Sequence, residues 1–334
     1  MAGGFIIVMN YSRYIAFPSL YFAAIVLFCL PAQCLAQQTR PSDSLVNLPE
    51  NVVLLPVSVR TKKGKYVAGL RRQNFTLIDE KAPQEISFFS NDNSPMSIGI
   101  VFDASGSTRG SDSEKKYRAT KLPLLLGQLK QFLQDSNPGN EYFLIGFNSS
   151  PQLLSDWTSD SNSLLEPLTK VLPKDNSAFF DAAYLALTKV TQGKYRKRAL
   201  LMLTDGEDNI SHYSFKELAK GIQETDVSIY AVGPESRADS LSVASQAMLE
   251  ELCNLSGGAA FFPTNKEKNL TPLFASIALG LRDQYLLGFV PKHPADHSKW
   301  HKLKVKLSLP PDAPKDAKDW EVRARQGYYG AKLP

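Results

Sequence analysis

The sequence predicts an α/β protein in which a doubly wound, mostly parallel sheet is flanked by a small β module. Between residues 95 and 282, short runs of Ile, Val and Leu alternate with segments of helical period. Strands buried on both faces form such continuous apolar runs, and their alternation with helices is typical of a parallel sheet covered on both sides. Strand-like segments at 49–94 and 283–334 precede and follow this region. We expect these two segments to pair in one β module.

The elements can be assigned in order along the chain. Residues 37–48 are polar and are expected to form a linker. In the flanking segments, strand-like runs begin near Val52, Asn74 and Ile86, and again at 285–290, 303–309 and 320–325. Ser214 and Glu217 have the spacing of a capping box and predict a helix start. The α/β region is expected to hold strands at 98–102, 142–147, 152–157, 199–203, 227–232 and 259–262, with helices within 113–134 and at 178–191, 215–223, 241–255 and 270–281.

The composition excludes several classes of protein. Of 334 residues, 43% are hydrophobic and 21% are charged, which is too apolar for a disordered chain. The 38 Lys+Arg and 33 Asp+Glu give a net charge of +5 without any run of five basic residues, so nucleic acid is not an expected partner. Three cysteines are too few for a disulfide scaffold, and Cys253, in an apolar helical pattern, is expected to be a buried helix residue.

Residues 1–36 have the features of a secretory signal peptide. Arg13 supplies a basic start, Tyr14–Leu30 is an uncharged apolar run broken by Pro18, and Cys34-Leu35-Ala36 offers small residues before a cleavage site. The run is short for a membrane span of about 20 residues. We therefore expect a secreted, periplasmic or surface-held protein. An uncleaved N-terminal anchor is the alternative, and it is the only membrane contact we expect.

Oxygen-bearing side chains gather where the α/β strands are expected to end. The first strand leads into Asp103-Ala104-Ser105-Gly106-Ser107, Ser177 precedes a helix, and Thr204-Asp205-Gly206 follows the run at 199–203. In doubly wound sheets, ligands bind at the carboxyl ends of the strands. A few carboxylates with hydroxyls and water suit a hard divalent cation, with Mg²⁺ first and Mn²⁺ or Ca²⁺ as alternatives.

The pattern Asp103-x-Ser105-x-Ser107, with Ser177 and Thr204-Asp205-Gly206 downstream, resembles the metal-ion-dependent adhesion site of von Willebrand factor type A (VWFA) domains, also found in integrin inserted domains. The resemblance implies that Ser105 and Ser107 coordinate the ion directly, and that Asp103 and Asp205 hold it directly or through water. The hydroxyl of Ser177 would join when ligand is bound, although the family usually has Thr there. Around these ligands we expect supporting roles for four residues: Gly106, Asp181, Thr204 and Gly206.

The same resemblance implies a function. In this family the sixth coordination position is left open for an acidic side chain of a partner, so we expect a non-enzymatic protein that engages a protein ligand through a carboxylate, as in cell adhesion. The flanking segments, with Val59, Gly64 and Phe75 ahead and Tyr285–Phe289 and Arg325–Tyr329 behind, resemble a bacterial group of secreted VWFA-related proteins.

Three other interpretations follow from the residues. A structural scaffold with a vestigial metal site would explain the Ser at position 177. A metal-assisted phosphoryl transferase or hydrolase would need a Gly-rich phosphate loop or a general base near the ion, and neither is visible in the sequence. His293, His297 and His301 are close in sequence, but Pro291 and Pro294 disfavour a helix, so we expect a polar hairpin loop there and no second metal site.

Overall fold

The central sheet of the protein has six strands in the order β10-β9-β8-β5-β6-β7. In this computed structural model the described residues are 51–105, 122–171, 176–233, 240–263, 269–291, 299–311 and 313–330. The chain divides into two compact units, residues 1–39 and 40–334, and all described residues belong to the second. The sheet is parallel except for β7, which pairs antiparallel with β6. Its strands are β5 (Ser97–Asp103), β6 (Glu141–Phe147), β7 (Pro151–Thr158), β8 (Arg198–Leu203), β9 (Ser228–Val232) and β10 (Ala259–Phe261).

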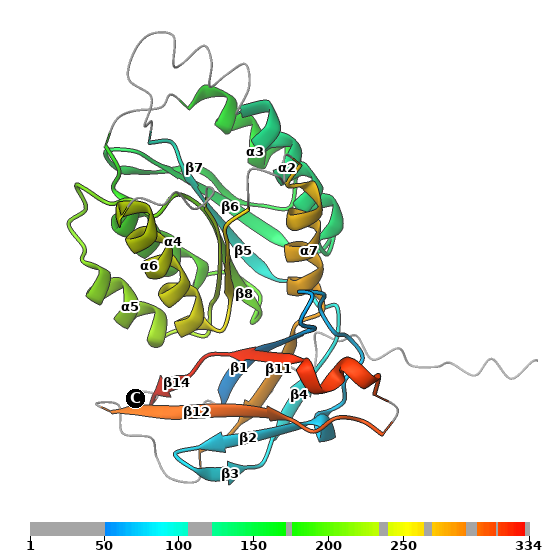
Figure 1. The fold of residues 1–334 in the computed structure, drawn as a ribbon. Helices are drawn as coiled ribbons and strands as arrows, with labels where there is room; N and C mark the ends of the chain where they lie inside the picture. Colours follow the sequence, from blue (N-terminus) through cyan, green and yellow to red (C-terminus); the bar gives the residue numbers. More distant parts are fainter. Residues whose placement is uncertain are drawn as a thin grey trace, which may run out of the picture. The chain divides into compact units, whose positions relative to one another are not determined.

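Helices cover both faces of this sheet (Figure 1). Alternate residues of β5 point to opposite faces of the sheet: Ile100 belongs to one apolar core and Val101 to the other. This confirms the predicted doubly wound α/β class. One face packs against α2 (Leu122–Asp135), α3 (Ser161–Leu165) and α7 (Thr271–Arg282), and the other against α4 (Phe179–Val190), α5 (Phe215–Gln223) and α6 (Ser240–Ser256).

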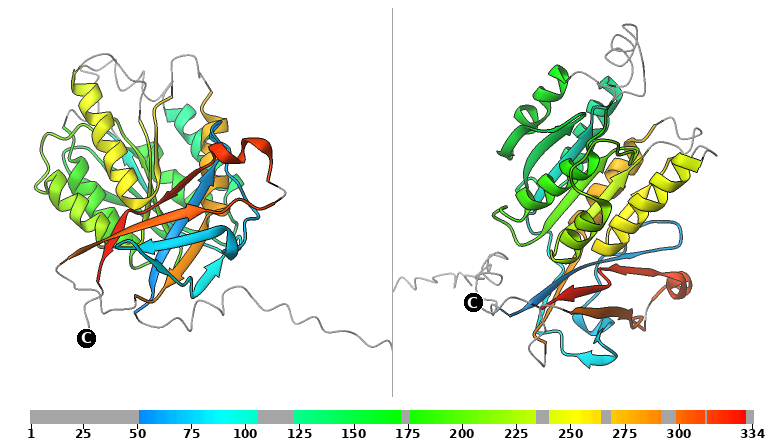
Figure 2. Two further views of the ribbon diagram at one scale, coloured as in Figure 1. Left: turned by 60° about the horizontal axis from the view of Figure 1, so that its bottom comes forward. Right: turned by 90° about the vertical axis from the view of Figure 1, so that its left-hand side faces the viewer.

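The two flanking segments form a β module of two four-stranded antiparallel sheets, β13-β1-β11-β4 and β14-β12-β2-β3, as the sequence predicts. Figure 2 shows from two further sides that strands from the start and the end of the described chain lie side by side in this module. A third apolar core lies within it. The strands are β1 (Val53–Arg60), β2 (Phe75–Asp79), β3 (Ala82–Gln84), β4 (Phe88–Ser90), β11 (Tyr285–Phe289), β12 (Trp300–Leu307), β13 (Glu321–Ala324) and β14 (Gly327–Tyr329).

One expectation for this region is wrong. His301 does not lie in a hairpin loop, because β12 begins at Trp300 and His301 pairs with Tyr328 of β14, with ring centroids 5.1 Å apart. The strand begins earlier than the sequence predicted because residues 300–302 pair with β14. His293 and His297 lie outside the described residues.

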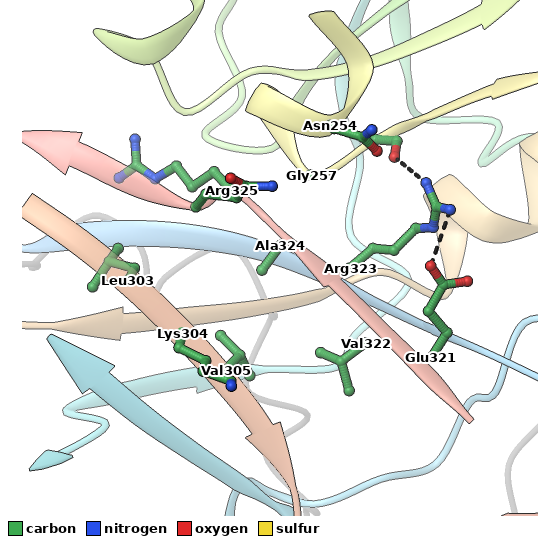
Figure 3. A pocket seen from close by; sticks show the side chains of 12 residues that line it. Asn254, Gly257, Leu303, Lys304, Val305, Glu321, Val322, Arg323, Ala324 and Arg325 are labelled. Carbon is green, nitrogen blue, oxygen red and sulfur yellow. Dashed lines mark hydrogen bonds and ion pairs between the residues drawn. The ribbon is translucent and has the colours of Figure 1, made fainter. Parts of the chain in front are cut away.

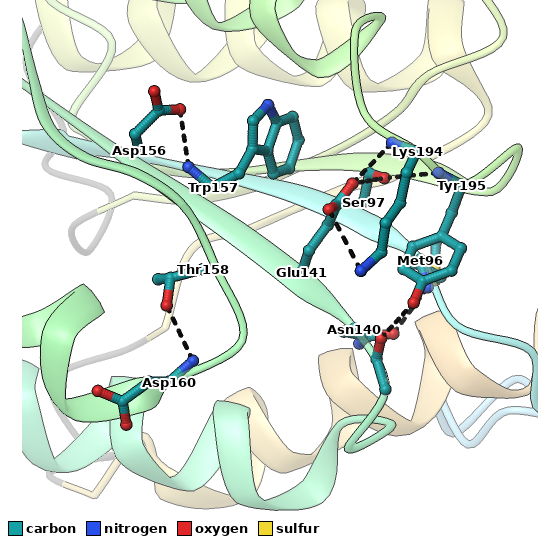
Figure 4. Close-up of polar contacts among 11 residues, drawn as sticks. Met96, Ser97, Asn140, Glu141, Asp156, Trp157, Thr158, Asp160, Lys194 and Tyr195 are labelled. Atoms are coloured by element: carbon teal, nitrogen blue, oxygen red, sulfur yellow. Dashed lines mark hydrogen bonds and ion pairs between the residues drawn. The ribbon is translucent and has the colours of Figure 1, made fainter.

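A polar cluster fixes the amino ends of the parallel strands (Figure 4). The Ser97 hydroxyl and the Lys194 backbone N–H donate to the same oxygen, Glu141 Oε1, at 2.6 and 2.7 Å. The Tyr195 N–H donates to Ser97 Oγ at 3.1 Å. Because these polar groups satisfy one another, the amino ends of β5 and β6 are bonded to the turn before β8.

Lys197 joins the two connections between the α/β region and the β module. Its side chain is 2% exposed, and its ammonium donates to the carbonyl oxygens of Asp92 at 2.8 Å and Gln284 at 3.1 Å. Asp92 lies between β4 and β5, and Gln284 lies between α7 and β11. Burial lowers the pKa of Lys197 to about 8, against the opposing effect of the Asp92 and Asp283 carboxylates. One side chain therefore holds both connections at the start of β8.

The end of α6 makes the closest backbone contact with the β module. Gly257 has a φ of +78° and donates to the Asn254 carbonyl, and Gly258 donates to the Cys253 carbonyl at 2.9 Å, which is a Schellman motif. A pocket of about 290 Å³ lies between this turn, β12 and β13 (Figure 3). Cys253 is a free, buried helix residue, as predicted, and burial raises the pKa of its thiol to about 12.

Candidate metal centre

Asp103 is the last residue of β5 and lies at the carboxyl edge of the sheet. The Ala104 N–H donates to the Phe147 carbonyl at 2.8 Å, which keeps the chain in the plane of the sheet one residue beyond Asp103. One carboxylate oxygen, Oδ1, accepts from the Ser105 N–H at 2.8 Å and from the Ser105 hydroxyl. The other oxygen, Oδ2, accepts from the Thr204 hydroxyl at 2.7 Å. Asp103 therefore joins the loop after β5, here called the first loop, to the loop between β8 and α5, here called the third loop.

The Asp103 carboxylate is in an unfavourable place for a negative charge. The pKa of Asp103 is raised to about 6: desolvation is the largest cause and the nearby Asp205 carboxylate adds to it, while the hydrogen bonds from Ser105 and Thr204 lower the pKa in part. Among the described residues, none of the groups that shift this pKa is a cation. A bound divalent cation would supply the positive charge that favours the ionised form.

The third loop turns sharply at Gly206. This residue has a φ of +79°, its N–H donates to Thr204 Oγ1 at 3.0 Å, and a Cβ there would approach Leu249 to 3.0 Å. A glycine adopts this conformation without strain. Asp205 Oδ1 accepts from the Glu207 N–H at 3.0 Å, so the second carboxylate is oriented by its own loop.

Ser177 is buried and bonded to the third loop. Its hydroxyl donates to the Glu207 carbonyl at 2.6 Å, its N–H donates to Asn209 Oδ1 at 3.0 Å, and its carbonyl accepts from the Asn209 N–H at 3.0 Å. The second loop, which contains Ser177 and precedes α4, is thus held to the third loop by three hydrogen bonds at this one residue. Asn209 was not predicted as a site residue; the only sequence signal is the polar run between β8 and α5.

The donor set fits a hard cation. The Ser105 and Ser177 hydroxyls each donate their proton to a protein oxygen, so the lone pairs of both oxygens remain for a metal ion. Within the described residues no group of three His, Cys, Asp or Glu side chains could hold a metal. The expected set is different, since it combines two carboxylates with hydroxyls. Ser107 and Gly106 lie outside the described residues.

Asp181 accepts hydrogen bonds from the third loop. Its Oδ1 accepts from the His212 and Tyr213 N–H groups, both at 2.9 Å, and its Oδ2 lies 2.9 Å from His212 Nδ1. Burial alone would raise the pKa of Asp181, but the hydrogen bonds from Tyr213 and His212 lower it overall. In return, Ser211 Oγ accepts from the Asp181 N–H at 3.1 Å, in the first turn of α4, which has no local side-chain cap. The loop and the helix start therefore stabilise each other.

We expect Asp181→Ala to release this loop. Three donors would lose a charged acceptor, and the protein should be destabilised by roughly 2–4 kcal/mol. Hydrogen–deuterium exchange should become faster in residues 209–213. Asp160→Ala is the matched control, because Asp160 accepts from Asn162 and Ser163 N–H groups at the start of another helix. Unchanged exchange in residues 209–213 after Asp181→Ala would contradict the proposed contact.

Comparison with known proteins identifies a family for part of the chain. Residues 98–207 match the family model described as the von Willebrand factor type A domain. A UPF0353 protein of Mycolicibacterium paratuberculosis is 28% identical over 188 residues, which are 50% of this chain and 56% of that protein. The chain thus spans little more than half the length of this relative.

Two solved structures are similar at a greater distance. The von Willebrand factor type A structure from Catenulispora acidiphila is 13% identical and covers 85% of this chain and 65% of its own, with a TM-score of 0.47. The conserved hypothetical protein BatB from Bacteroides thetaiotaomicron is 18% identical and covers 55% of this chain and 98% of its own, with a TM-score of 0.42. The family match alone, which includes Asp103, Ser177 and Asp205, identifies residues 98–207 as part of a von Willebrand factor type A domain.

Proposed function

We propose that this chain is a non-enzymatic binding protein that holds Mg²⁺ at the carboxyl ends of β5 and β8 and uses it to engage an acidic side chain of a protein partner. The observation that carries the proposal is the arrangement around Asp103. A carboxylate with a raised pKa accepts the proton of the Ser105 hydroxyl, and the Ser177 hydroxyl donates its proton to the Glu207 carbonyl. A cation would favour the ionised form of this carboxylate, and the free lone pairs of the hydroxyls are suited to one.

Each residue would have a distinct part in this site. Ser105, Ser107 and Ser177 would offer hydroxyl oxygens, while Asp103 and Asp205 would hold the ion directly or through water. Both carboxylates already accept hydrogen bonds from the protein, which withdraws part of their charge from the ion. The ion would therefore keep a partial positive charge toward solvent, and this charge would favour an incoming carboxylate. Mn²⁺ or Ca²⁺ could replace Mg²⁺ at the same oxygens.

The proposed function also requires that the protein be exported from the cytoplasm. The predicted signal peptide at residues 1–36 lies outside the described residues. In the part of the chain that the structure describes, no helix has the length and hydropathy needed to cross a membrane. We propose a secreted, periplasmic or surface-held protein, in which the metal site meets its partner outside the cytoplasm.

Titration calorimetry of the exported chain with Mg²⁺ and with Mn²⁺ tests the metal site. We expect binding by the wild type, loss of binding in Asp103→Ala and Asp205→Ala, and unchanged binding in Asp160→Ala, which removes a carboxylate at a remote helix start. If neither Asp103→Ala nor Asp205→Ala alters binding, the proposed site is wrong.

A second experiment tests the role of the ion in recognition. Capture of partners from a cell-envelope extract should be lost in excess chelator and restored by Mg²⁺. Equal capture with and without chelator would instead favour a structural scaffold with a vestigial metal site. Hydrolysis of a phosphoester panel that disappears in Asp103→Ala would favour an enzyme.

A further inference from the structure

The solvent face of the sheet β14-β12-β2-β3 carries a row of lysines that the metal site does not use. Along β12, Lys302, Lys304 and Lys306 are exposed, whereas Leu303 between them is buried in the core of the β module. Alternate residues of a strand point to the same face and are spaced by about 6.7 Å. The three lysine side chains therefore leave the same face of the strand in one row.

The row lies in a basic part of the chain. Residues 299–334 contain nine basic and four acidic residues, a net charge of +5 that equals the net charge of the whole chain. Within the described residues, none of the three lysines forms an ion pair with a carboxylate. The nearest acidic group on the neighbouring strand end is Glu80, whose carboxylate accepts from the Lys302 N–H at 2.7 Å.

The neighbours of the lysines across the sheet are mostly neutral. Lys304 lies opposite Ile78 and Lys306 lies opposite Thr76 on β2, and Lys302 lies opposite Gly327 on β14. Directly paired residues share a face of the sheet. The charge of the row is therefore not balanced by the strands beside it.

Two aromatic rings continue the same face at the start of β12. Trp300 lies opposite Tyr329, with ring centroids 5.2 Å apart, and both are half-buried. A Cβ at Gly327 would lie 2.4 Å from an indole carbon of Trp300, so the indole covers the glycine. This packing holds the indole in place without a larger side chain beneath it. The rings and the lysines together form the basic face, defined here as Trp300, Lys302, Lys304, Lys306 and Tyr329.

We infer that the basic face binds an acidic polysaccharide. A linear polymer with repeated carboxylates matches a straight row of cations, and the flat rings offer a surface for the apolar faces of sugars. Lysine ammonium groups are point charges that do not impose the paired geometry with which arginine binds phosphate. A polymer outside the cytoplasm is also consistent with the predicted export of this chain.

Affinity electrophoresis of the exported full chain in gels containing alginate, a polyuronate, tests the inference. We expect retardation that is absent in gels containing neutral dextran. The variant Lys302→Gln/Lys304→Gln/Lys306→Gln should bind alginate at least tenfold more weakly. For this variant, the slope of log affinity against log salt concentration should be shallower by about 2–3, because each lysine releases about one counterion on binding. Excess chelator is present throughout, so the result does not depend on the proposed metal site.

The matched control is Lys62→Gln/Lys63→Gln/Lys65→Gln, which removes three exposed lysines from the turn after β1. It should leave alginate binding nearly unchanged. An equal loss in this control would show attraction by net charge alone and would overturn the inference. Tighter binding of a single-stranded oligonucleotide than of alginate would overturn it as well, and so would the absence of alginate binding.

The aromatic part of the basic face is tested separately by Trp300→Leu. Leucine keeps an apolar side chain over Gly327 but has no ring face, so the variant should fold and bind alginate several-fold more weakly with an unchanged salt dependence. Thermal unfolding of each variant confirms that it is folded. Wild-type affinity in folded Trp300→Leu would remove Trp300 from the binding surface.

Discussion

Replacing Asp103 with Asn is expected to stabilise the metal-free protein and to abolish its response to Mg²⁺. The pKa of Asp103 is raised to about 6 from its ordinary value of 3.8. The folded state therefore binds the proton more tightly than the unfolded state, so the contribution of this group is present below the unfolded pKa and is lost as pH rises through about 6. Above that pH the carboxylate costs up to about 3 kcal/mol.

Asparagine avoids this cost because it is neutral, but it cannot accept the Thr204 proton at its amide nitrogen. We therefore expect a net gain of about 1–2 kcal/mol near neutral pH in chelator. Urea unfolding measures this gain, which should shrink toward pH 4 as the wild-type carboxyl becomes protonated. Excess Mg²⁺ should stabilise the wild type and leave Asp103→Asn unchanged.

The exposed residue Asp160 provides the control for this prediction. Asp160→Asn changes the same charge at a helix start and should alter neither the stability in chelator nor the Mg²⁺ response. A wild type that is more stable than Asp103→Asn in chelator near neutral pH would show that the carboxylate is not strained by burial. A Mg²⁺ response in Asp103→Asn would show that the ion binds elsewhere.

Gly257→Ala is expected to be the most damaging small substitution at the junction with the β module. The added Cβ would lie 2.6 Å from the Ala324 carbonyl carbon and 2.6 Å from the Arg325 nitrogen, so backbone atoms would have to move. The φ of +78° adds a strain of about 1 kcal/mol for a residue with a Cβ. We expect a total loss of roughly 3 kcal/mol or more in the free energy of unfolding.

Gly69→Ala separates the two causes. Gly69 has nearly the same φ, +82°, but nothing lies within 4 Å of the position of its Cβ. It should lose only about 1 kcal/mol. Urea unfolding of both variants gives the difference, which measures how tightly β13 lies against the end of α6. Equal losses in the two variants would mean that β13 moves away without cost.

The parts of the fold that follow from local pattern were predictable from the sequence. Continuous apolar runs identified the parallel strands because both faces of the sheet are covered. The capping box of Ser214 and Glu217 is confirmed at the start of α5, since its two partners are three residues apart. The turn at Asp103 and Ser105 is local in the same way.

The contacts that the sequence does not predict join residues far apart in the chain. Asp181 is bound by N–H groups about 30 residues later, and any of several polar residues before α5 could have supplied them. Lys197 gives no signal in the sequence because its partners are backbone carbonyls, which every residue has. The start of β12 was misplaced because two prolines before it suggested a loop, while pairing with β14 decided the outcome.

The pairing of β1 with β11 has a consequence for the order of folding. Val57 lies opposite Tyr285, so the first described strand must wait for a partner made more than 200 residues later. Closing so long a loop of unfolded chain is entropically costly, and a compact insert with adjacent ends removes most of that cost. Folding of the von Willebrand factor type A domain would then bring β1 and β11 close together. The β module would form after that domain. Emerging first from a ribosome or a translocation channel, β1 would remain without its partners for most of the synthesis of the chain.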